Sequence, residues 1–176
     1  MEKLRHLHVY SNPVFSMQDN ETEKATQLGN LDSLSTPSLS FGKHTENIMR
    51  RFLKLRRLRC LFSESRVDVG NSNQFPVLNC LTELESLKIL CSGRIAHPFK
   101  FDFPLKLKKL TLSKFRLPWD CILEVGRLPN LEVLKLLSRA FEGKVWDMKE
   151  GQFPKLNFLK LDTLNLAQWN ATSDDF

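Results

Sequence analysis

The feature that most constrains the fold of this chain is a short leucine pattern that recurs along its whole length. The pattern is L-x-x-L-x followed by an apolar residue, and Thr36 in the second copy is its weakest match. The first leucines of the seven copies are Leu4, Leu31, Leu55, Leu84, Leu107, Leu131 and Leu156. One copy alone would also fit a buried helix face, but seven copies spaced 23 to 29 residues apart predict leucine-rich repeats.

The repeat predicts a solenoid, because one coil of chain cannot bury its leucines alone. Each copy is expected to form a short strand whose fourth and sixth residues point inward, and stacked coils bury these residues against one another. We therefore predict an α/β fold over residues 1–176. It is a horseshoe arc with a parallel sheet on the concave face and short helices or irregular segments on the convex face.

The segments between the strands are less regular than the strands themselves. Residues 45–52 predict a short helix with Thr45 as its N-cap, and residues 120–125 predict a second one. Asp120 is the expected N-cap of the second helix, and Gly126 is its expected C-terminal stop.

Both ends of the chain are expected to be cut from a longer array. Met1 already occupies the apolar position three residues before Leu4, and Phe176 would occupy the same position of an eighth copy. A solenoid needs polar caps on its terminal coils, and the sequence offers none. We therefore expect about seven repeats of a larger protein.

The sequence contains no recognisable catalytic or cofactor motif. Gly42-Lys43-His44-Thr45 lacks the first glycine of a phosphate-binding loop and the Ser/Thr that follows its lysine. The four cysteines have no zinc-like spacing, and His6 and His8 lack an obvious third metal ligand. We expect no enzyme activity, no metal and no cofactor in this chain.

Hydropathy and the N-terminal sequence bear on location. No stretch approaches 18 consecutive apolar residues, and the first residues lack the apolar run of a secretory signal. We therefore expect no membrane span, a reducing compartment and a cytoplasmic protein.

The positive charge of the chain is concentrated at three positions of the repeat. The second, third and fifth residues of the copies line the predicted concave face and together carry a net charge of +6, whereas the rest of the chain is neutral. A basic face of a solenoid favours acidic protein partners. The expected partner-binding residues are Arg57, Arg59, Lys88, Lys109, Lys135, Phe158 and Lys160.

This face has two other interpretations. Exposed strand positions often carry Lys and Arg with no binding role, so an ordinary solvated face stays open as the alternative. Nucleic acid is not an expected partner, because Phe158 is the only aromatic residue at the third and fifth positions of these copies and no nucleic-acid motif is present.

Three stretches carry a resemblance to a known family. They are residues 128–137 running on to Trp146, residues 153–161 and residues 30–37. They resemble the leucine-rich-repeat region of plant intracellular immune receptors that carry a coiled-coil head and a nucleotide-binding domain. The nightshade late blight resistance group is the most similar, and the resemblance covers essentially the whole chain.

The resemblance implies a role in plant defence and the hypersensitive response. In such receptors the repeat region recognises pathogen effectors or guarded host proteins and restrains the nucleotide-binding switch. The ADP/ATP site lies in the nucleotide-binding domain, which is absent from this chain, so the resemblance assigns no nucleotide-binding residue here.

Two other classes of repeat protein remain as alternatives. The chain could be the substrate-recognition repeat domain of a ubiquitin-ligase adaptor, which an F-box-like segment upstream would indicate. It could also belong to an extracellular repeat receptor. That class would require a signal peptide, capping cysteines and an L-x-G-x-I-P repeat, and this sequence has none of them.

Overall fold

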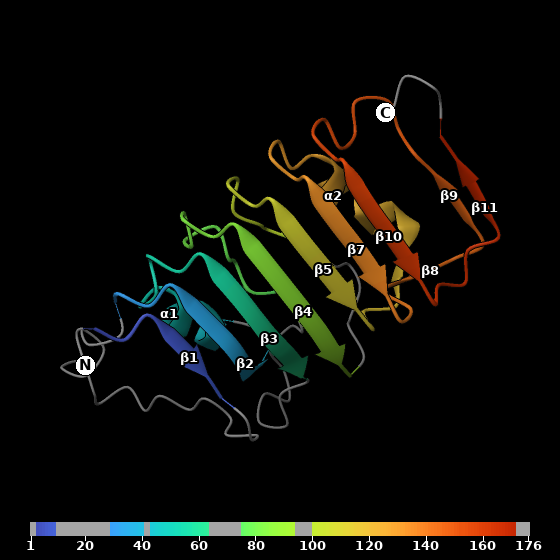
Figure 1. The fold of residues 1–176 in the computed structure, drawn as a ribbon. Helices are drawn as coiled ribbons and strands as arrows, with labels where there is room; N and C mark the ends of the chain where they lie inside the picture. Colours follow the sequence, from blue (N-terminus) through green and yellow to red (C-terminus); the bar gives the residue numbers. More distant parts are fainter. Residues whose placement is uncertain (1–2, 10–28, 41–42, 64–74, 94–99, 172–176) are drawn as a thin grey trace.

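The fold of this chain is organised around one parallel β-sheet. The computed structural model describes residues 3–9, 29–40, 43–63, 75–93 and 100–171. Its seven-stranded sheet has the order β1-β2-β3-β4-β5-β7-β10, so each strand pairs with the strand of the next copy (Figure 1). The strands are β1 (His6–His8), β2 (Ser33–Ser40), β3 (Arg57–Ser63), β4 (Ser86–Ser92), β5 (Lys109–Ser113), β7 (Val133–Leu137) and β10 (Phe158–Asp162). This architecture confirms the predicted solenoid.

The second leucine of each copy points into the core, as the repeat predicts. Leu87, Leu110 and Leu134 are at most 1% exposed and pair in register across β4, β5 and β7. Leu159 was also expected to be buried, but it is only half-buried. The reason is its place in β10, which among the described residues is the edge strand of the sheet and has a neighbouring strand on one side only.

The third to seventh copies enter their strands through the same turn. The backbone N–H of Leu55, Leu84 and Leu131 donates to the carbonyl oxygen three residues earlier, at 2.9, 3.0 and 3.5 Å. Those carbonyls belong to the apolar residues that precede each copy, such as Phe52 and Leu81, which are fully buried. The apolar position before the first leucine therefore holds the turn against the core.

The weak second copy produces the one irregularity in the sheet register within the described strands. The pairing of β2 with β3 shifts between Ser35 and Ser38, where Thr36 has a φ of 62°. After this bulge Leu39 points inward again and is 3% exposed. A threonine in the left-handed region is uncommon, and the extra residue restores the inward alternation beyond it.

The returning segments contain the expected short helices, but not with the expected caps. Helix α1 spans Lys43–Met49, a 3-10 turn spans Trp119–Cys121, and helix α2 spans Ile122–Gly126. Thr45 lies inside α1 and is buried, and the Trp119–Cys121 turn and α2 have no side-chain cap, so Thr45 and Asp120 were wrongly assigned as caps. Gly126 is the last residue of α2, and a Cβ there would lie 3.1 Å from the Gln152 side chain. Close packing, and not a left-handed stop, accounts for this glycine.

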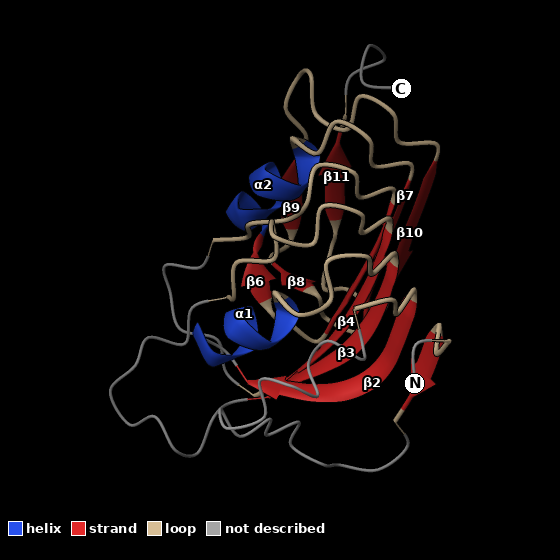
Figure 2. Cartoon of the chain, turned by 90° about the vertical axis from the view of Figure 1, so that its left-hand side faces the viewer, coloured by secondary structure: helices blue, strands red, loops and turns tan. Residues whose placement is uncertain are grey.

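The convex side also carries short strands that the sequence did not indicate. Strand β6 (Leu117–Pro118) pairs with β8 (Phe141–Glu142), and β9 (Val145–Asp147) pairs with β11 (Gln168–Asn170). Figure 2 shows these strands with α1 and α2 on the side opposite the main sheet. Trp119, Trp146 and Trp169 stack there at centroid distances of 4.8 and 5.6 Å. Aromatic stacking therefore organises the convex side of the last coils.

The expectation that both ends are cut from a longer array depends on two terminal residues. Met1 and Phe176 lie outside the described residues.

Candidate protein-interaction surface

The exposed face of the main sheet arranges its side chains in rows that run across the strands. In a parallel sheet without slippage, equivalent positions of successive copies lie side by side, about 4.8 Å apart. Arg59 pairs with Lys88, Lys88 with Thr111, and Thr111 with Lys135. We call the row of fifth positions the central row; its members in the structure are His8, Ser35, Arg59, Lys88, Thr111, Lys135 and Lys160.

The third positions form a parallel row two residues closer to the strand starts. This row contains Arg57, Lys109 and Phe158, which are aligned with the third positions of the strands between them. At its first strands the His6 ring Nδ1 and the Ser33 hydroxyl are 2.7 Å apart, within hydrogen-bonding distance. The structure therefore brings all seven residues that the sequence selected onto one continuous face.

Ion pairs neutralise the cations nearest the strand starts. Arg56 binds Glu85 at 2.8 Å, with Lys108 at 4.0 Å from the same carboxylate. Arg57 binds Asp32 at 2.8 Å. These contacts raise the pKa of Arg56 and lower the pKa of Glu85, chiefly through the hydrogen bond that joins them. The charge of this part of the face is largely satisfied within the chain.

The cations of the central row are different, because carboxylates do not neutralise most of them. Among the described residues, the central-row cations Arg59, Lys88 and Lys135 make no ion pair. Burial and the positive charges of Arg59 and Lys135 lower the pKa of Lys88. The centre of the face is thus a cluster of mutually repelling cations.

The last two expected residues lie at the β10 edge of the face. Phe158 is 46% exposed, and the Lys135 Nζ lies 5.4 Å from the centroid of its ring, which is a cation–π contact. Lys160 lies 3.5 Å from Asp162, so its charge is partly neutralised. Phe158 therefore offers an exposed apolar surface directly beside a cation.

A row that contains three leucines lies next to the central row and was not predicted from the sequence. The seventh positions Leu61, Leu90 and Leu137 follow the outward alternation of their strands, and Leu90 is 37% exposed. Their register also includes Ser38, Ser113 and Asp162. The sixth position of each copy points inward, so strict alternation along the strand predicts that the seventh position points outward. This alternation is the sequence signal that identifies the three leucines. The exposed face is therefore amphipathic, with cations in the middle and leucines toward the strand ends.

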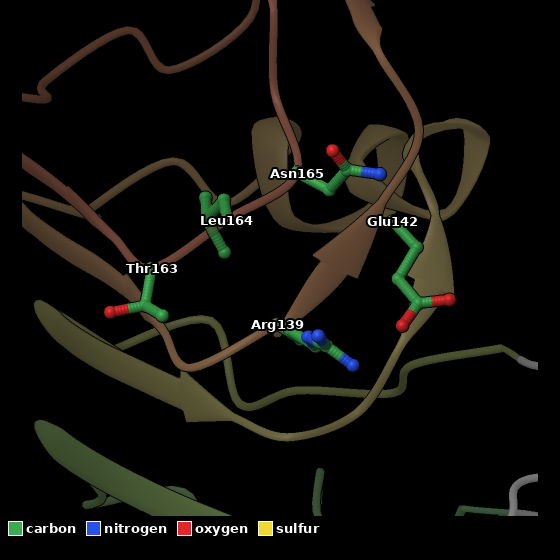
Figure 3. Close-up of a pocket in the computed structure, with 5 residues that line it drawn as sticks. All are labelled: Arg139, Glu142, Thr163, Leu164 and Asn165. Carbon is green, nitrogen blue, oxygen red and sulfur yellow. The ribbon is translucent and has the colours of Figure 1, made fainter.

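A hollow lies beyond the ends of strands β7 and β10. Figure 3 shows its lining residues, which are Arg139, Glu142, Thr163, Leu164 and Asn165. Glu142 also lies 3.9 Å from Arg116, and the backbone N–H of Arg139 donates to the carbonyl oxygen of Thr163 at 3.0 Å. The polar groups of this hollow mainly hold neighbouring coils together.

The other potentially reactive groups of the described residues are thiols and possible metal ligands. No three His, Cys, Asp or Glu side chains in this part of the chain are placed to hold a metal ion. Burial raises the pKa of the Cys91 thiol to about 11 and also raises the pKa of Cys60, so both stay protonated near neutral pH. No described helix is long and apolar enough to cross a bilayer.

Comparison with known proteins relates the whole chain to one group of plant proteins. It is 36% identical over 174 residues to late blight resistance protein homolog R1B-8 of Solanum demissum, and 36% identical over 182 residues to homolog R1B-16. It is 34% identical over 182 residues to homolog R1B-13 of the same species. These alignments cover 96% to 100% of the chain. The resemblance to the nightshade late blight resistance group is therefore confirmed, and no family model matches the chain.

The chain corresponds to a small part of these relatives. It spans 14% of the length of R1B-8 and R1B-16 and 15% of the length of R1B-13. The activities and partners of the whole proteins therefore do not transfer to it directly.

Proposed function

We propose that this chain, a relative of the late blight resistance protein homologs along its whole length, is a protein-interaction repeat domain of a plant disease-resistance receptor. In this role it recognises pathogen effectors or guarded host proteins and restrains the receptor's nucleotide-binding switch. The observation that carries the proposal is the 34% to 36% identity over nearly the entire chain. The solenoid fold supports it, because repeat solenoids use their extended faces for binding.

The proposed contact surface is the basic face of the main sheet, with Arg57, Arg59, Lys88, Lys109, Lys135, Phe158 and Lys160 as its residues. Its support is the group of central-row cations, Arg59, Lys88 and Lys135, that have no ion pair among the described residues. Acidic surfaces of an effector, a guarded protein or the receptor's own nucleotide-binding domain are the proposed partners. We place this activity in the cytoplasm and assign the chain no catalytic role.

The test uses a receptor of full length. This chain replaces the corresponding segment of R1B-8, and cell death is scored in leaves with and without an effector. The triple variant Arg59→Glu, Lys88→Glu and Lys135→Glu should signal without effector if an inhibitory contact is lost, or stay silent if an effector contact is lost. The folded state should persist, because exposed substitutions change stability by about 0.5 kcal/mol or less each.

A matched control makes the same charge change away from the main sheet. Lys100, Lys144 and Lys149 are exposed and lie outside its strands. Their reversal to Glu should leave signalling as in the parent receptor. If the control alters signalling and the sheet variant does not, the proposed surface is wrong.

We further propose that this chain binds no nucleotide. Isothermal titration of the 176-residue chain with ADP or ATP and Mg²⁺ should give no saturable heat, because the sequence lacks a phosphate-binding loop. Saturable, magnesium-dependent binding would contradict this assignment.

A further inference from the structure

The exposed face of the main sheet carries cations without ion pairs beside partly exposed leucines. This combination indicates the chemistry of the partner that fits it. Arg59 and Lys88 lie on adjacent strands with no ion pair in the described part of the chain, and Lys135 lies two strands beyond Lys88. Directly beside them, two residues farther along each strand, lie Leu61, Leu90 and Leu137.

We infer that this face binds an extended acidic segment of another protein, in which carboxylates alternate with apolar side chains. The carboxylates pair with Arg59, Lys88 and Lys135, and the apolar side chains cover Leu61, Leu90 and Leu137. The inference rests on the proposed function of the sheet as a protein-interaction surface and names the chemistry of the partner.

Charge complementarity is the first argument. Cations near the strand starts already have carboxylate partners, such as Asp32 for Arg57 and Glu85 for Arg56. The central cations repel one another, and this repulsion contributes to the lowered pKa of Lys88. Carboxylates from a partner remove that repulsion, whereas a neutral or basic partner does not.

The row that contains three leucines is the second argument. Leu90 is 37% exposed, and Leu61 and Leu137 are half-buried, although the inward face of the same strands already supplies the core. These leucines lie partly exposed beside the charged row, with buried Ser113 between Leu90 and Leu137, and apolar groups of a partner would cover them. A nucleic-acid backbone would pair with the cations but leave these leucines exposed to water.

Spacing supports an extended segment. Arg59 and Lys135 lie three strands apart, which is about 14 Å at the usual strand spacing. Residues i and i+4 of an extended chain lie about 13–14 Å apart, and their side chains lie on the same side. Five residues with acids at the first, third and fifth positions therefore span the cations. If the segment lies between the two rows, its intervening side chains point to the opposite side, toward the leucines.

The experiment measures binding of short fluorescent peptides to the 176-residue chain by anisotropy. The main probe has alternating glutamate and leucine, and it should bind more tightly than a glutamate–serine or a lysine–leucine peptide of equal length. A single-stranded oligothymidine of similar charge serves as the polyanion probe and should bind weakly. Equal affinity for the glutamate–leucine and glutamate–serine peptides, stronger binding of the oligothymidine, or no binding of any peptide would overturn the inference.

Two double variants separate the rows. Lys88→Glu with Lys135→Glu, and Leu90→Ser with Leu137→Ser, should each weaken binding of the glutamate–leucine peptide by about tenfold or more. The matched controls are Lys100→Glu with Lys144→Glu, and Leu53→Ser with Leu105→Ser, whose leucines are 54% and 70% exposed elsewhere. The controls should bind like the parent chain, and urea unfolding checks that every variant folds.

The leucine variants also distinguish this inference from the proposed function. In the full-length receptor, Leu90→Ser with Leu137→Ser should change signalling in the same direction as the Arg59, Lys88 and Lys135 reversal. If the charge reversal changes signalling and the leucine variants do not, the proposed function stands and the acidic–apolar partner is wrong. If neither set has an effect, the proposed contact surface and the acidic–apolar partner are both wrong.

Discussion

At the scale of single residues, neighbours on both sides decide how much an inward leucine contributes. Leu134 is fully buried between the strands that carry Leu110 and Leu159, whereas Leu159 lies in the edge strand and is half-buried. Leu134→Ala should lower the free energy of unfolding by about 2–5 kcal/mol, and Leu159→Ala by less than about 2 kcal/mol. Urea unfolding followed by circular dichroism measures both values. Equal losses would mean that β10 is covered on both sides in solution.

Lys88 differs from the buried leucines, because it is expected to contribute to binding and to lower the stability of the fold. Burial and the charges of Arg59 and Lys135 lower its pKa in the folded chain. The unfolded chain then holds this proton more tightly, so this group makes stability rise as alkaline pH removes the proton from the folded state. Lys88→Gln should therefore keep or raise the free energy of unfolding at neutral pH and reduce its rise with alkaline pH. Loss of stability in urea titrations at neutral pH would contradict this.

At the scale of elements, the short strands of the convex side depend on close packing at a glycine. Gly143 has a φ of +135°, and a Cβ there would lie 2.8 Å from the Cδ1 atom of Trp119. The Trp119 Nε1 also donates a hydrogen bond to the carbonyl oxygen of Gly143 at 3.0 Å. Gly143→Ala should cost about 1–3 kcal/mol or more, since strain and overlap add.

Gly151 is the control for this prediction. Its φ is +76°, but a Cβ there meets no atom within 4 Å. Gly151→Ala therefore carries only the backbone strain, about 1 kcal/mol. Thermal unfolding of both variants should show a clearly larger loss for Gly143→Ala. A similar loss at the two positions would mean that contact with Trp119 does not limit the site.

At the scale of the whole molecule, the sheet has an edge that is only partly protected. Strand β10 pairs with β7 on one side, and its inward Leu159 and Leu161 are half-buried. Unpaired backbone groups and partly exposed leucines favour pairing with a second chain. The 176-residue chain should therefore self-associate as its concentration rises, and Leu161→Glu should reduce this. Sedimentation velocity at several concentrations measures it, and a monomer throughout would show that the edge is inert.

The sequence by itself determined the architecture. A leucine pattern with a period of 23 to 29 residues allows each coil to bury its apolar side chains only by stacking on its neighbours, which requires a parallel sheet. The same period fixed which residues share the exposed face, because in-register stacking aligns equivalent positions such as Arg59 and Lys88. Both the fold and the row of cations could therefore be predicted from spacing alone.

The role of each of these positions depends on the three-dimensional packing around it. The sequence could not show that Asp32 neutralises Arg57 whereas Lys88 has no such partner among the described residues, because an ion pair depends on side-chain distances across strands. The sequence could not show whether Thr45 lies inside the helix or at its N-cap, because helix boundaries depend on packing against the sheet. It also missed Leu61, Leu90 and Leu137, since a leucine beyond the repeat pattern is exposed or buried according to how far its strand continues to alternate. Spacing specifies which residues are neighbours, and the three-dimensional packing specifies which of them are left for a partner.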